Sequence, residues 1–169
     1  TEIYTLSLHD ALPISAWGVL GSNWGISRTM AQVHALLLIS PAPLSTEDVM
    51  EQLSISRGNA NLNLRALMDW KLVYKVILKG ERKEYFSAEK DIQKVAMHIT
   101  NERRKRELQP VLEIVDTLKS LNCDSDEARE MKKVIGDIEQ FSLKADNFAK
   151  KLISMNESIF WNTLYKLIN

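Results

Sequence analysis

Arginine and asparagine side chains recur along residues 56–70, SRGNANLNLRALMDW. These side chains form paired hydrogen bonds with base edges and phosphates, so the chemistry that they offer is recognition of nucleic acid. The polar set is Arg57, Asn59, Asn61, Asn63 and Arg65. Behind a capping Ser56, the three-and-four spacing of one helical stripe is formed by Ala60, Leu64, Leu67 and Met68. We therefore expect a helix whose stripe faces a core and whose polar side chains face outward.

Residue types that catalyse reactions are not arranged in any recognisable constellation. The sequence contains no glycine-rich phosphate loop, no serine elbow and no carboxylate pair at a suitable spacing. His34 and His98 lie on separate predicted helices without a Cys or acidic ligand at metal spacing, which favours packed or surface histidines. Cys123 has no nearby basic pair that would activate its thiol, so we interpret it as structural or incidental. We expect no enzyme, no metal site and no cofactor.

The composition sets the class of protein. The chain has 169 residues, of which 45% are hydrophobic and 26% charged, and this is enough for one sizeable core with a helical appendage. Its formal net charge of zero argues against binding of nucleic acid through bulk charge, so any basic surface must be local. No apolar run approaches the roughly 18 residues of a membrane span. The single cysteine fits a reducing compartment, and we expect a cytoplasmic protein without a membrane partner.

The first residues require separate treatment. Residues 1–14, TEIYTLSLHDALPI, resemble the translation of a short-read sequencing adaptor. We therefore expect residues 1–15 to be a non-native leader and exclude them from the prediction of the fold. Asp10 and Pro13 interrupt the apolar character of this stretch, which is not that of a signal peptide.

Two helices precede the arginine- and asparagine-rich helix. Apolar residues at helical spacing predict the first over residues 22–40, and the breaker Pro41–Pro43 ends it. A second, short helix is predicted after Leu44, with a hydroxyl cap and with Glu47 and Asp48 in its first turn. Residues 54–56 then turn the chain into the next helix. This pattern is typical of a helix-turn-helix unit, although any small helical hairpin produces a similar one.

A β-hairpin is predicted directly after this unit. Residues 72–78 and 82–86 read as strands, and Lys79–Glu81 as the turn between them. The cations Lys79, Arg82 and Lys83 leave its tip positive and suited to a phosphate backbone. A solvated charged hairpin would explain the charges but not their position, so we interpret the hairpin as the wing of a winged helix-turn-helix.

Three segments resemble the GbsR/MarR-type transcriptional regulators. They are WGISRTMAQVHALL from Trp24, PLSTEDVMEQLSISRGNANLNLRALMDWKLVYKV from Pro43, and KGERKEYFSAEKD from Lys79. The resemblance covers about half of the chain at the level of motifs and extends weakly into ERRKREL, residues 102–108. It implies a dimeric bacterial or archaeal repressor, some of whose relatives respond to choline or to other osmolyte-linked ligands.

A long helix is predicted over residues 88–122. Pro110 interrupts it, and we expect a kink or break between Glu107 and Pro110 because proline removes a hydrogen bond and clashes with the preceding turn. The charged run Arg103–Arg106 precedes the proline. Such a run is usually the solvated face of a helix, and Glu102 and Glu107 supply partners, so this interpretation is preferred to contact with DNA phosphates.

The most regular pattern in the sequence follows residues 122–126. Apolar residues alternate at spacings of three and four over four heptads: Met131, Val134, Ile138, Phe141, Ala145, Phe148, Leu152, Met155 and Ile159. So small a winged domain cannot cover this seam, which must pair with another helix of the chain or with a second copy. We prefer a homodimer, with Phe141, Phe148 and Leu152 at its interface. Two-fold symmetry would then present two recognition helices to a pseudo-palindromic operator.

Aromatic residues in the same region are candidates for an effector site. Aromatic faces attract quaternary ammonium groups such as choline, and the residues in question are Phe141, Phe148, Phe160, Trp161 and Tyr165. Because Phe141 and Phe148 occupy heptad positions, core packing is the preferred explanation.

The predicted protein is mainly α-helical with a small β-hairpin. A winged helix-turn-helix domain over residues 16–90 precedes a helical dimerisation and effector region over residues 91–169. We expect it to regulate transcription as a dimeric repressor that contacts double-stranded DNA through two groups of side chains: Arg57, Asn59, Asn61 and Arg65 on the helix, and Lys79, Arg82 and Lys83 on the wing. The alternative is a winged helix that binds another protein, with the heptad helix as its scaffold.

Overall fold

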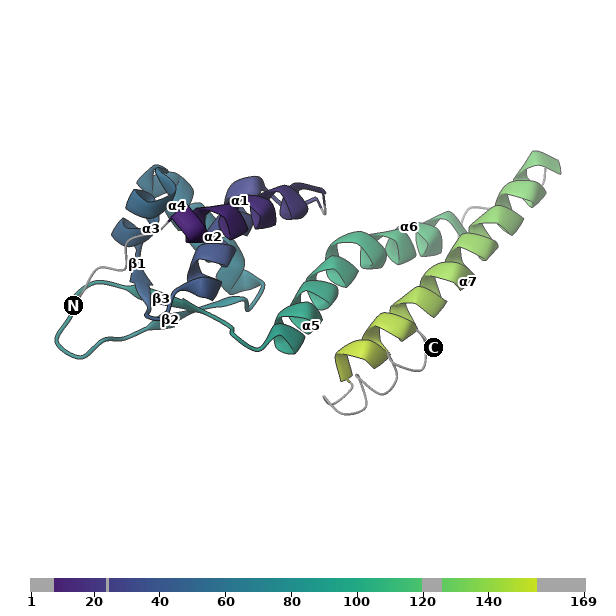
Figure 1. The fold of residues 1–169 in the computed structure, drawn as a ribbon. Coiled ribbons are helices and arrows are strands. Elements are labelled where there is room, and N and C mark those ends of the chain that lie inside the picture. Colours follow the sequence, from purple (N-terminus) through teal and green to yellow (C-terminus); the bar gives the residue numbers. More distant parts are fainter. Residues whose placement is uncertain (1–7, 24, 120–125, 155–169) are drawn as a thin grey trace, which may run out of the picture. The chain divides into compact units, whose positions relative to one another are not determined.

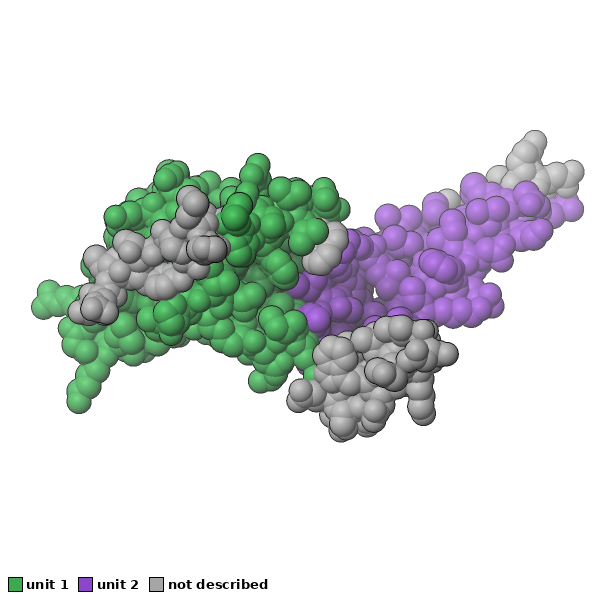
Figure 2. Space-filling view, in the orientation of Figure 1, with its two compact units in different colours: residues 1–95 green, residues 96–169 purple. Residues whose placement is uncertain are grey.

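The computed structural model describes residues 8–23, 25–119 and 126–154. Its contacts divide the chain into two compact units, residues 1–95 and residues 96–169, which Figure 2 colours separately. The first unit contains α1 (Leu8–Asn23), α2 (Arg28–Ile39), β1 (Leu44–Ser45), α3 (Thr46–Leu53), α4 (Arg57–Asp69), β2 (Val73–Val76) and β3 (Tyr85–Ala88) (Figure 1). Helix α5 (Ile92–Arg103) crosses the division, and η1 (Arg104–Leu108), α6 (Gln109–Lys119) and α7 (Asp126–Ser154) follow.

Helix α2 begins later than the sequence pattern predicts. Ser27 caps it by accepting a hydrogen bond from the Met30 N–H, and Gly25 precedes the cap with a φ of +79° that favours glycine. The expected start at residue 22 is therefore wrong, because this turn separates α1 from α2. The breaker at Pro41–Pro43 is confirmed, since α2 ends at Ile39.

Helix α1 packs closely against α2. A Cβ at Gly21 would collide with the Ala31 Cβ, so glycine permits the close approach. Residues 8–15, which the sequence analysis excludes as a leader, form the first half of α1, and Ile14 is buried.

The helix-turn-helix prediction is confirmed by its caps. Ser45 and Asp48 form a reciprocal capping box at the start of α3, where the Asp48 carboxylate also accepts the Ser45 backbone N–H at 2.7 Å. Ser54 ends α3 in the left-handed conformation with a φ of 52°, and Ser56 caps α4 by accepting the Asn59 N–H. The turn therefore occupies the residues that the sequence predicts.

The hairpin forms part of a three-stranded antiparallel sheet with the order β1-β3-β2. Val73 pairs with Ala88 and Val76 with Tyr85, while Leu44 of β1 pairs with Phe86. The second strand thus begins at Tyr85 and not at Arg82 as predicted. Residues 77–84 form a longer connection, which we call the wing loop; Gly80 adopts a φ of +89° within it.

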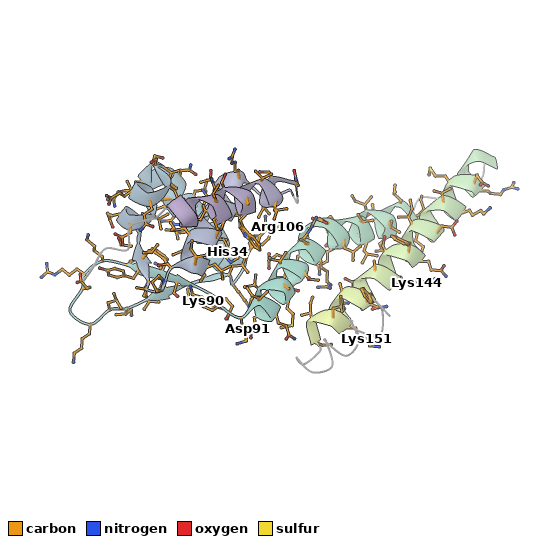
Figure 3. The ribbon with its side chains drawn as sticks, viewed as in Figure 1. His34, Lys90, Asp91, Arg106, Lys144 and Lys151 are labelled. Carbon is orange, nitrogen blue, oxygen red and sulfur yellow. The ribbon has the colours of Figure 1, made fainter. Side chains whose placement is uncertain are left out.

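The core of the first unit lies between α2, α4 and the sheet. Its most deeply buried side chains are Val33, Leu36, Leu37, Val49, Leu64, Leu67 and Val73. Lys90, just after β3, reaches the C-terminus of α2 (Figure 3). Its Nζ donates to the carbonyl oxygens of Leu37, Leu38 and Ser40 at 2.8, 2.6 and 2.9 Å. These are carbonyls that the end of a helix leaves without helical partners, so a cation stabilises them.

The long helix predicted over residues 88–122 begins at Ile92 and changes character at η1. The chain widens at η1 into a π-helical turn, in which the Gln109 N–H donates to the Arg104 carbonyl five residues earlier. Pro110 follows directly. Because proline has no N–H and its ring needs space against the preceding turn, the wider π-helical turn accommodates it. The expected irregularity near Glu107 to Pro110 is therefore confirmed, as a widening of the helix.

Helix α7 packs against α6 and η1 through a face that hydrophobic periodicity does not reveal. The buried side chains of this face are Ala128, Ile135, Ser142 and Asp146. By contrast, the heptad seam is exposed: Phe141 is 74% and Phe148 56% accessible, and Leu152 is intermediate. Met155 and Ile159 lie outside the described residues. Within the second unit, therefore, no other described helix covers the seam, and one of the two predicted alternatives, pairing with another helix of the same chain, is not met in that unit.

Candidate nucleic-acid interface

The outer face of α4 lies opposite its buried stripe. Ala60, Leu64 and Leu67 are at most 1% exposed, as the three-and-four spacing predicts, whereas Met68, the fourth predicted member of the stripe, is only half-buried. Arg57, Asn61 and Arg65 follow each other at intervals of four along one side of the outer face. Gly58 and the 68% exposed Leu62 lie beside them, and a Cβ at Gly58 would meet nothing within 4 Å. The outer face therefore combines cations and an amide with one apolar side chain.

Arg57 is oriented by an acidic residue that the sequence analysis did not single out for this role. Its Nη2 donates to the Glu47 Oε1 at 2.7 Å, and both side chains remain accessible to solvent. The pKa of the Glu47 carboxyl is lowered mainly by a hydrogen bond from its own backbone N–H and then by Arg57. Glu47 is predicted to be in the first turn of its helix, but pattern alone cannot pair it with a residue of the next helix.

Asn61 shares this side of the interface. Its Oδ1 accepts from the Thr46 Oγ1 at 3.5 Å, so α3 contacts it through the oxygen and not through the amide N–H₂ group. That group is the donor by which an asparagine recognises an acceptor on a base edge.

Asn63 does not face outward, and its inclusion in the outer polar set is wrong. It is 6% exposed because its position, three residues after Ala60, lies on the buried stripe. Its Nδ2 donates to the Asn59 Oδ1 at 2.7 Å, and its Oδ1 accepts from Ser27 at 3.3 Å. Asn63 therefore joins α4 to the cap of α2. Asn59 lies on the flank of the helix, with its side-chain oxygen already engaged.

The wing loop carries the predicted cations Lys79, Arg82 and Lys83, all of them exposed. Lys83 also lowers the pKa of Glu47, by less than the hydrogen bonds of that carboxylate and the charge of Arg57 do. The charges of Lys83 and Arg57 therefore act on the same carboxylate. At the base of the loop, Lys75 pairs with Glu84 at 2.6 Å. Ile77 is 94% exposed on the loop. Glu47 thus lies near enough to both Arg57 and Lys83 for both charges to act on it.

The remaining candidates lie elsewhere. His34, which Figure 3 labels, lies in α2 and is 3% exposed. Its ring centroid is 6.5 Å from that of Trp17. Burial, assisted by the charge of Lys90, lowers the pKa of His34 to about 4. Within residues 8–23, 25–119 and 126–154, no three His, Cys, Asp or Glu side chains gather where they could hold a metal ion. In the same part of the chain, no helix has the length and apolar character needed to cross a membrane. Cys123 lies outside the described residues.

The charged run Arg103–Arg106 has acidic partners in the second unit. Arg103 pairs with Glu107 at 2.9 Å, and Lys105 with Glu102 at 2.7 Å, as a solvated helix face predicts. Arg104 departs from this pattern: its side chain is only 14% exposed and donates to the Asp146 Oδ1 of α7 at 2.5 Å. Arg104 therefore connects η1 to α7.

Comparison with known proteins places the fold. No protein-family model and no curated protein matches the chain. A solved crystal structure described as a transcriptional regulator is similar to it, with a TM-score of 0.67 over 86% of this chain and 95% of that chain. The chain shares that protein's fold. The two sequences are 15% identical, so the likeness concerns the arrangement of a mainly helical chain with a small sheet.

Proposed function

We propose that the chain is a sequence-specific DNA-binding transcriptional regulator, a dimeric repressor of the GbsR/MarR type that binds a pseudo-palindromic operator. The observation that carries this proposal is the outer face of α4, where Arg57, Asn61 and Arg65 line one side of a helix that follows a tight turn. A helix of this kind fits the major groove, where arginine recognises guanine and asparagine recognises adenine.

The wing loop supports the same proposal. Its exposed cations suit contacts to the phosphate backbone, which position a protein without reading sequence. The chain as a whole has no net charge, so attraction to DNA is concentrated in this local surface. The fold shared with a structure described as a transcriptional regulator agrees with this role.

Dimer formation is supported by the exposed seam of α7. Side chains as apolar as Phe141 and Phe148 are 74% and 56% accessible in a single copy, and apolar surface of this extent on one helix face is typical of an interface. A two-fold dimer carries two α4 helices, which is why the operator is expected to contain two inverted half-sites. An effector site among the aromatic residues remains a prediction, since Phe160, Trp161 and Tyr165 lie outside the described residues.

Selection of bound duplexes from a random pool tests the proposal. We expect enrichment of one motif with two related, inverted half-sites, bound more tightly than unselected DNA at the same salt concentration. Equal binding of selected and random duplexes would contradict sequence-specific recognition and would favour the alternative of a winged helix that binds another protein.

Arg57→Ala and Asn61→Ala are expected to reduce discrimination between the selected duplex and single-base variants by about 1–3 kcal/mol each. Each change removes a side chain that can form paired hydrogen bonds with a base. Competition titrations with duplexes altered at one position measure the effect, and the loss should be confined to the positions that each side chain reads. An equal loss on every duplex would show that the residue contacts phosphate instead.

Lys83→Ala is expected to weaken binding of all duplexes alike and to reduce the slope of log K against log salt by about 1. The reason is that a wing cation contacts phosphate, whose position does not depend on sequence. The matched control is Lys94→Ala, an exposed lysine of α5 that pairs with Asp91 at 3.7 Å. The wing assignment fails if the two lysine variants bind DNA alike.

A further inference from the structure

The exposed stripe of α7 has two different flanks. The stripe consists of Met131, Val134, Ile138, Phe141 and Phe148, which are between 44% and 74% exposed. On one flank, Ile135 and Ser142 are buried where α7 packs against the rest of its own unit. A helix that packs on the stripe can therefore be flanked only by the other side of α7.

This second flank carries a row of charges at intervals of seven residues. Its members are Glu130, Asp137, Lys144 and Lys151, each one position before a residue of the predicted heptad seam. All four side chains are exposed, and Figure 3 labels the two lysines on α7. The row is acidic in the first half of the helix and basic in the second. In a second copy that runs in the opposite direction, the order of the charges is basic and then acidic. Each charge of the row therefore lies opposite a charge of the other sign.

Contacts within the helix do not account for these charges. Glu130 reaches Lys133 at 4.0 Å, and Lys144 reaches the Gln140 side chain at 3.5 Å. Both contacts are long and solvent-exposed, and pairs of this kind contribute little to stability. The charges are therefore available to a partner.

We propose that α7 pairs with α7 of a second copy in antiparallel orientation, with the two-fold axis between Ile138 and Phe141. The inference rests on the dimer of the proposed function and specifies its geometry. Ile138 then packs against Phe141 of the second copy, and Met131 against Phe148 of the second copy, as apolar layers of an antiparallel coiled coil. In the same register Asp137 faces Lys144 of the second copy and Glu130 faces Lys151 of the second copy. Each of these ion pairs occurs twice by symmetry.

A parallel pair of the same helices does not use the charged row. In that orientation the row would face the opposite flank of the partner helix, where Ile135 and Ser142 carry no charge and are already buried. Complementary charges and the free flank therefore both select the antiparallel arrangement.

Charge reversal in the full chain tests the pairing. Asp137→Lys places two lysines opposite each other on both sides of the two-fold axis, and Lys144→Glu places two carboxylates there. Each variant alone is expected to dimerise roughly tenfold more weakly than the parent chain, because two attractive pairs become repulsive. Mixed in equal amounts, the two variants should form a heterodimer with parental affinity, since every pair across that interface is again opposite in charge. Sedimentation equilibrium over a series of concentrations measures both results.

Lys132→Glu is the matched control, because it changes the same charge on the side of α7 away from the stripe and should leave dimerisation unchanged. The inference is overturned if the single reversals dimerise like the control, or if mixing does not restore the dimer.

DNA binding is measured separately on the selected duplex. If that duplex is bound specifically while the reversals leave the dimer intact, the antiparallel pairing is wrong and the proposed function stands. If neither the parent chain nor any variant discriminates between duplexes, the proposed function is wrong, whatever sedimentation equilibrium shows about dimerisation.

Discussion

Asp146→Ala is expected to destabilise the second unit by about 3–5 kcal/mol. The Asp146 side chain is 5% exposed and accepts from both Arg104 and Lys150, at 2.5 and 2.7 Å. The hydrogen bond from Lys150, and then that from Arg104, lowers the pKa of Asp146 despite its burial. Without this carboxylate, the Arg104 guanidinium, whose side chain is 14% exposed, is left as a poorly solvated charge between η1 and α7. Urea unfolding followed by helical circular dichroism measures the loss.

Two further variants separate the ion pair from general damage to α7. Lys132→Ala removes an exposed charged side chain of the same helix, away from the apolar stripe, and should change the free energy of unfolding by no more than about 0.5 kcal/mol. Replacing both partners, as Arg104→Met with Asp146→Leu, should recover most of the stability, because no buried charge is then left unpaired. If Asp146→Ala is as mild as Lys132→Ala, the pair does not hold η1 to α7.

Acidification from pH 6.5 to pH 4 is expected to cost the first unit about 3 kcal/mol through His34 alone. Burial lowers the pKa of His34 from 6.5 to about 4, so the folded chain keeps this imidazole neutral. Below pH 6.5 the unfolded chain binds a proton that the folded chain does not, and stability falls as the pH falls. The loss is complete near pH 4, where the folded state also becomes protonated. Denaturant midpoints at closely spaced pH values would show the slope.

His34→Gln should flatten that slope, since it removes the titrating group from the core. His98→Gln is the matched control, because it makes the same replacement in α5, outside this core. If the stability of the parent chain does not change between pH 6.5 and pH 4, the prediction for His34 is wrong. Among the described residues its Nε2 has no hydrogen-bond partner, which agrees with a neutral ring held by packing.

Local signals in the sequence predicted the features that depend on neighbours along the chain. The caps at Ser45 and Ser56 are each determined by residues within three positions, and both are confirmed. Three residues of the buried stripe of α4 are confirmed too, because the helical spacing of apolar residues identifies the face of a helix that is buried. The polar type of Asn63 predicts an outward position, but its place in the sequence belongs to the buried stripe, and the structure follows the place.

Features that depend on distant residues were not predicted. The pair between Arg104 and Asp146 joins residues 42 positions apart, and nothing in either neighbourhood identifies the partner. The packed face of α7 contains Ala128, Ser142 and Asp146, which a search for apolar residues overlooks. The heptad seam is apolar and is therefore visible in the sequence. Whether another helix of the same chain covers it depends on distant residues, and the sequence leaves this open.

The lysine that follows β3 determines where the first unit can be cut. Lys90 holds three carbonyls at the end of α2, which lies 50 to 53 positions earlier in the sequence. A shortened chain that stops at Ala88, where the sheet is already complete, would lack Lys90. The carbonyl groups at the end of α2 would then lose the hydrogen bonds from that lysine. The smallest fragment that folds like the intact first unit therefore extends past the wing, through Lys90 to Val95, where the contacts of that unit end.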